Sequence, residues 1–161
     1  MASKSPPAAP ERVARSASDT VDALEVAVAT LKAHALTGAI QWPLRGRNIG
    51  ILCNDPERPE AFLLQRAASD LGARVALVLW NADDASGSPA SQQTAHVLGR
   101  LYDVLICVEV PQEIARHLRD ASGIPVISDV AVEWAALCAA RPDATDDARY
   151  LLQALLIDLC C

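Results

Sequence analysis

The sequence predicts an α/β protein in which a four-stranded parallel sheet lies between two layers of helices. Two observations support this fold class. Four short apolar runs lack the polar alternation of a half-exposed strand, and each is followed by apolar residues at helical spacing. A chain of 161 residues also has room for one domain with its own core. The four runs are 48–53, 75–80, 104–108 and 124–127.

The N-terminal part divides into a tail and a helix. Residues 1–15 are rich in Pro, Ala and Ser, and we expect a disordered tail there, with the domain formed by residues 16–161. A helix from about 18 to 37 is expected because Ser16 and Asp19 resemble a capping box and Gly38 supplies a stop. The expected apolar face of this helix consists of Val21, Leu24, Val28, Leu31 and Ala35.

The segment 44–72 organises the rest of the chain. Residues 48–53 are expected to form a buried strand, and the polar residues and proline of 54–56 end it. Pro59 fits the first turn of a helix, which continues to Gly72. In an open α/β sheet, ligands bind at the turn that follows such a strand, so the composition of this turn decides what the protein can hold.

The remaining elements alternate in the same way, and Pro125 favours an edge position for the fourth strand. We expect a strand at 75–80, a loop at 81–91, a helix at 94–102, a strand at 104–108, a helix from Pro111 to Gly123, a strand at 124–127, a helix at 132–140 and a last helix from about Thr145 to Leu159.

The composition excludes several function classes. With a net charge of −6, the surface is unsuited to nucleic acid or to anionic membranes. No apolar run is long enough to span a bilayer and no apolar signal core is present, so we expect a cytoplasmic protein. The five cysteines show no C-x-x-C spacing, and we expect neither a metal nor a cofactor. We expect Cys53 and Cys107 to be buried and Cys160-Cys161 to form a frayed, reduced end.

Four stretches within residues 44–128 carry a family resemblance, and SQQTAHVLGRLYD at 91–103 is the most specific of them. The others are LRGRNIGILCNDP, AASDLGARV and QEIARHLRDASGIPVIS. Together they resemble the carbamoyl-phosphate-binding domain of the ornithine and aspartate carbamoyltransferase family. The resemblance implies a four-stranded parallel sheet, for which we expect the strand order 2-1-3-4. It also implies, commonly, a trimer whose active sites lie between subunits.

The family's catalytic groups do not carry over. Its phosphate loop reads Pro-Ser-Thr-Arg-Thr-Arg, and this chain has residues 56–61 there, so that Pro59 and Ala61 replace both arginines. The arginine after the family's third strand falls on Val108, and its His-Pro-x-Gln motif falls on 135–138. Losing three arginine contacts costs on the order of 5–9 kcal/mol of anion affinity. No catalytic residue is therefore assigned.

Seven residues are expected to line the strand ends as a hypothetical ligand site, and five of them are carboxylates. Our favoured interpretation is that Glu57 or Glu60 satisfies the free N–H groups of the helix N-terminus, so that no ligand binds. The alternatives are a pocket for a cationic or neutral metabolite, or a divalent cation held by Asp55, Glu57 and Glu109. The seven residues are Asn54, Asp55, Glu57, Arg58, Glu60, Glu109 and Asp129.

These observations predict a catalytically inactive, single-domain relative of the carbamoyltransferases. We expect it to act as a homo-oligomer, with a trimer as the family's expectation, or by association with a full-length carbamoyltransferase. Because the family's second domain is expected to be absent, apolar residues of the last helix would seek another chain; they are Leu151, Leu152, Leu155 and Leu156. The alternatives are a small-metabolite sensor that uses the acidic site, and a residual transferase.

Overall fold

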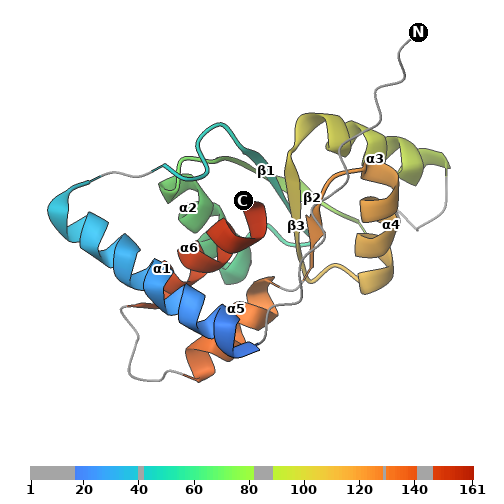
Figure 1. Cartoon of the computed structure of the whole chain (residues 1–161). Helices are drawn as coiled ribbons and strands as arrows, with labels where there is room; N and C mark the ends of the chain where they lie inside the picture. Colours follow the sequence, from blue (N-terminus) through green and yellow to red (C-terminus); the bar gives the residue numbers. More distant parts are fainter. Residues whose placement is uncertain (1–16, 40–41, 82–88, 129, 141–146) are drawn as a thin grey trace, which may run out of the picture.

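The computed structural model of the chain describes residues 17–39, 42–81, 89–128, 130–140 and 147–161. A central sheet separates two layers of helices (Figure 1). The sheet has four strands in the order β2-β1-β3-β4, and every adjacent pair is parallel. Both the fold class and the strand order predicted from the sequence are confirmed. The predicted tail, 1–15, lies outside the described residues.

The strands agree with the prediction except at the fourth. They are β1 (Asn48–Cys53), β2 (Arg74–Leu79), β3 (Val104–Val108) and β4 (Val126–Ile127). The strand predicted at 124–127 was too long, because residues 124 and 125 lie outside β4. The N–H of Ile124 turns toward the hydroxyl of Ser122 at 3.5 Å, and Pro125 has no N–H to donate to a neighbouring strand.

The helices occupy the predicted segments with shifted ends. The clearest shift is at α3, which begins at Pro89, so that the end of the expected 81–91 loop is helical, while 82–88 lie outside the described part of the chain. Pro is well suited to the first turn of a helix, which the loop prediction overlooked. The helices are α1 (Ala17–Thr37), α2 (Pro59–Asp70), α3 (Pro89–Leu101), α4 (Gln112–Ser122), α5 (Val130–Ala139) and α6 (Ala148–Cys160).

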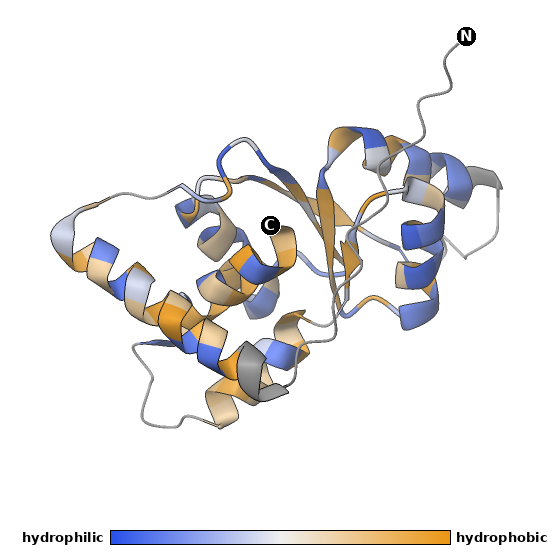
Figure 2. Cartoon of the chain, in the orientation of Figure 1, coloured by the Kyte–Doolittle hydropathy of each residue, from blue (hydrophilic) through white to orange (hydrophobic). Residues whose placement is uncertain are grey.

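The core lies on both faces of the sheet, and most of the strand residues are coloured as hydrophobic (Figure 2). On one face, α2 and α6 pack on Ile49, Ile51 and Ile106. On the other, α3 and α4 pack on Leu52, Leu105 and related side chains. Side chains in β1 and β3 are almost all fully buried because both faces of these strands are covered.

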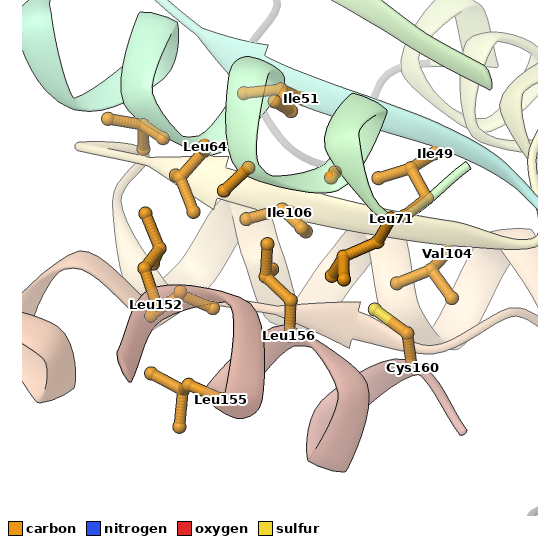
Figure 3. Packing of buried hydrophobic residues seen from close by; sticks show 14 of the residues in the cluster. Ile49, Ile51, Leu64, Leu71, Val104, Ile106, Leu152, Leu155, Leu156 and Cys160 are labelled. Atoms are coloured by element: carbon orange, nitrogen blue, oxygen red, sulfur yellow. The ribbon is translucent and has the colours of Figure 1, made fainter. Parts of the chain in front are cut away.

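The expectation that the leucines of α6 lack a cover was wrong. Leu152 and Leu156 of α6 face Ile106 and Leu64 in the core (Figure 3). Leu156 is 0% exposed, and Leu151 is only 5% exposed because α1 packs across it. The helix pairs α1·α6, α2·α6 and α5·α6 are all in contact. This helix therefore contributes to the core, and its four leucines are covered within the chain.

Helix α1 is buried along a narrower stripe than the sequence predicts. Leu24 and Val28 are buried against Leu151 and Ala154 of α6, whereas Val21 is 38% exposed. Ala35, also assigned to the apolar face, is exposed. The difference arises because α6 is the main helix that α1 contacts. Only the side chains of α1 that face α6 are therefore buried.

Helices α3 and α4 cross closely at Gly99, inside the motif that carries the family resemblance. A Cβ atom at this position would lie 2.2 Å from the carbonyl oxygen of Ser122 in α4. Because real Cβ atoms do not approach so closely, a larger residue would push the two helices apart. The glycine therefore serves helix packing rather than a ligand.

The cysteines are buried at three positions. Cys53 and Cys107 lie in the core, as predicted, and burial raises the pKa of the Cys107 thiol to about 12. The expectation of a frayed end was wrong for Cys160, which is the last residue of α6, is 6% exposed and has a pKa raised to about 11 by burial. Cys161 is exposed. Across the described residues, no helix combines the length and apolar character that a membrane span requires.

Candidate functional site

The candidate site lies at the carboxyl ends of β1 and β3, which are neighbours in the sheet. Cys53 pairs with Val108 at the end of the ladder, so Asn54 and Glu109, the next residues, leave the sheet side by side. The turn from β1 then leads directly into α2 at Pro59. Six of the seven predicted residues belong to these segments, as the sequence suggested, whereas Asp129 lies outside the described residues.

The guanidinium of Arg58 is paired with the carboxylate of Glu109. Arg58 is the one cation among the seven predicted residues, and this contact engages it from within the chain. The side chains are 35% and 50% exposed, so solvent screens the pair and its contribution to stability is about 0–1 kcal/mol. The pair matters for ligand binding, because the Glu109 carboxylate already occupies the guanidinium that an anionic ligand would contact.

The backbone of Glu109 has a positive φ of 54°, the left-handed conformation that glutamate rarely adopts. Such a conformation costs a residue with a side chain roughly 1–2 kcal/mol. It persists where the surrounding structure holds it, and such residues concentrate at sites and switches. In this chain the left-handed conformation of Glu109 turns the backbone directly after β3, and the Glu109 side chain contacts Arg58.

The turn between β1 and α2 is held by its own groups. The carboxylate of Asp55 accepts a hydrogen bond from the N–H of Glu57 at 2.9 Å, and its carbonyl accepts one from the N–H of Arg58 at 3.4 Å. Pro59 has no N–H, and Arg58 places no side-chain cap on α2. The Asp55 carboxylate thus satisfies a backbone N–H of the turn that precedes α2. That Glu57 or Glu60 satisfies the N–H groups of the helix N-terminus stays a prediction.

Glu60 differs from the other carboxylates of the site. Its Oε2 atom is buried and has no hydrogen-bond partner among the described residues. Buried carboxylate oxygens are ordinarily bonded, because leaving one without a partner costs on the order of 1–3 kcal/mol. Glu60 lies in the first turn of α2, where partial positive charge favours an acidic side chain.

The structure does not support the metal alternative. In the part of the chain that the structure describes, no three His, Cys, Asp or Glu side chains form a group that could hold a metal ion. Asp55, Glu57 and Glu109, considered for a divalent cation, therefore do not form one.

Sequence reasoning missed a contact between the two helices on the opposite face. Nε2 of His117 in α4 lies 3.4 Å from the hydroxyl of Ser91 in α3. The two residues are 26 positions apart in the sequence, so no local pattern predicts their contact. His117 is thus engaged with a neighbouring helix.

Comparisons with known proteins identify the relatives. No family model matches the chain. The catabolic ornithine carbamoyltransferase of Pseudomonas putida is 31% identical over 104 residues, which make up 65% of this chain and 31% of that protein. The ornithine carbamoyltransferase of Haemophilus influenzae is 30% identical over the same shares. The chain is a relative of the carbamoyltransferases. It spans about a third of the length of the curated relatives that it matches.

Solved structures of carbamoyltransferases share the fold. The ornithine carbamoyltransferase of Burkholderia thailandensis superposes with a TM-score of 0.61 at 18% identity, over 77% of this chain and 46% of that one. The aspartate transcarbamoylase of Trypanosoma cruzi gives a TM-score of 0.56 at 16% identity, over 72% and 36%. These structures confirm the fold that the resemblance implied, and the similarity to the curated ornithine carbamoyltransferases agrees with the resemblance noted in the sequence.

Proposed function

We propose that this carbamoyltransferase relative is catalytically inactive and acts by association with other subunits. The supporting observation is the contact between Arg58 and Glu109, which engages the arginine of the phosphate-loop segment with a carboxylate of the same chain. The loss of both family arginines to Pro59 and Ala61 points in the same direction. The partner would be further copies of this chain or a full-length carbamoyltransferase.

The energies oppose binding of carbamoyl phosphate at this turn. Micromolar affinity requires about 8 kcal/mol of net binding energy. A hydrogen bond to a charged group contributes roughly 1.5–3 kcal/mol, so Arg58 alone falls short even without competition. An entering anion would also have to displace Glu109 and approach the exposed carboxylates of Asp55 and Glu57. The site as it stands repels the ligand that the family's phosphate loop grips.

The proposal is tested by mixing the chain with the full-length ornithine carbamoyltransferase of the same organism. Size-exclusion chromatography with light scattering should show a complex, or a homo-oligomer of the chain alone. Citrulline formation by the chain alone from ornithine and carbamoyl phosphate should stay at the level of the buffer blank. Monomeric behaviour together with no complex would contradict the association. Citrulline formation that disappears in Arg58→Ala would contradict the inactivity.

A second candidate function, a small-metabolite sensor, is favoured by Glu60. The buried Oε2 atom without a partner would be satisfied by a ligand that donates a hydrogen bond, such as an ammonium or an amide group. A thermal-shift screen of cationic and neutral metabolites tests this function. A genuine ligand should raise the melting temperature of the wild type but not of Glu60→Gln. The exposed Glu57→Gln variant, with the same change of charge, should respond like the wild type.

A further inference from the structure

We infer that the free edge of β2 is an interface, and that its occupant is a second copy of this chain paired antiparallel through β2. The strand order places β2 at the edge of the sheet, with β1 as its one neighbouring strand in the described structure. The strand has six residues, and its middle, Val75–Val78, is half-buried, whereas β1 and β3 are almost entirely buried. A long apolar edge strand is a template for pairing with another chain.

The hydrogen bonds fix which backbone groups face outward. The N–H of Arg74 donates to the carbonyl of Arg47 at 2.8 Å, and the N–H of Trp80 donates to the carbonyl of Cys53 at 2.9 Å. Even-numbered residues of β2 therefore direct their N–H and C=O groups toward β1. Because the direction alternates along a strand, Val75, Leu77 and Leu79 direct theirs toward the open edge.

These outward groups are self-complementary under a two-fold axis. With the axis near Leu77, this residue lies opposite Leu77 of the second copy, and Val75 lies opposite the second copy's Leu79. Each pair exchanges two backbone hydrogen bonds, and the two sheets continue into one. Leu79 is 59% exposed in the single chain, and α2, which packs on β2, carries the exposed side chains Phe62 and Leu63.

The charges at the two ends of β2 favour the antiparallel arrangement. At the amino end of the sheet, Arg45, Arg47 and Arg74 are exposed. At the carboxyl end, Asp55 and Glu57 are exposed in the turn after β1. Antiparallel pairing turns the amino end of one copy, where the three arginines outnumber the exposed Asp70 and Asp103, toward the acidic carboxyl end of the other. Parallel pairing would set like charges together.

Two pairs of variants test this interface, with light scattering and sedimentation equilibrium of the full chain as the readout. Leu79→Pro removes an outward N–H and leaves the ladder with β1 intact, a change that edge strands tolerate. Leu79→Ala, its control, keeps the N–H. Arg74→Glu reverses a charge of the interface, and its control, Arg116→Glu, reverses a charge on the exposed surface of α4.

The wild type should have a mass of about 34 kDa, twice the 17.1 kDa of one chain. Leu79→Pro and Arg74→Glu should each weaken the dimer at least tenfold, whereas Leu79→Ala and Arg116→Glu should leave it within threefold. Should Leu79→Pro fail to fold by circular dichroism, Arg74→Glu decides. A monomeric wild type, or an oligomer that neither variant weakens, overturns the inference. Neither result bears on the association with a full-length transferase, which the mixing experiment measures separately.

Discussion

Replacing Leu156 by Ala tests whether α6 completes the core of this domain. Leu156 is 0% exposed and packs in the cluster that joins α6 to α2 and the sheet. Truncation of a leucine at such a position costs about 2.7–5 kcal/mol, the lost transfer energy plus the cavity. Leu36 in α1 offers a matched control because it is 88% exposed, and its replacement by Ala should stay within about 0.5 kcal/mol.

The assay is equilibrium unfolding in urea. With a slope of about 2 kcal/mol per molar urea, a loss of 3 kcal/mol moves the midpoint down by roughly 1.5 M, and Leu36→Ala should leave it nearly unchanged. The slope itself should be the same in all three proteins. A shift for Leu156→Ala as small as that of the control would show that Leu156 does not contribute to a packed core. The expectation from the sequence, that the apolar residues of this helix pack against another chain, would then hold.

Three further outcomes follow from the structure. Gly99→Ala should lower the free energy of unfolding by about 1–3 kcal/mol, since the added methyl meets the carbonyl of Ser122, and urea titration measures it. Glu109→Gln should free Arg58, so that calorimetry detects inorganic phosphate binding in the millimolar range, where the wild type gives no saturable heat, with a stability change below about 1 kcal/mol. Burial raises the pKa of Cys107 to about 12 from 9.0, so above pH 9 the unfolded thiol ionises first. Stability should thus fall from pH 9 toward 12, and less steeply in Cys107→Ala.

The parts of the fold that the sequence predicts well are those set by local pattern. The runs at 48–53 and 104–108 are apolar throughout because β1 and β3 are covered on both faces, and no competing signal obscures them. Gly123, expected to close a helix, lies in the left-handed conformation directly after α4. Where hydrogen bonds to neighbouring side chains intervene, as at Ile124 and Ser122, the prediction of the strand was too long.

The errors concern tertiary contacts. The apolar character of Leu151 and Leu156 was read correctly, but what covers them depends on where α1 and α6 pack, which no local pattern contains. The sequence gathered the right segments at the strand ends, yet it could not pair Arg58 with Glu109. That contact depends on the register of β1 and β3 and on the positive φ of Glu109.

Isothermal titration of carbamoyl phosphate into the wild-type chain is the direct test of whether the turn after β1 has lost its anion site. We expect no saturable heat up to millimolar ligand, because Glu109 already engages Arg58 and the neighbouring turn is acidic. Saturable binding at micromolar concentrations that disappears in Arg58→Ala would contradict it. The turn after β1 would then hold the family's anion with a single arginine.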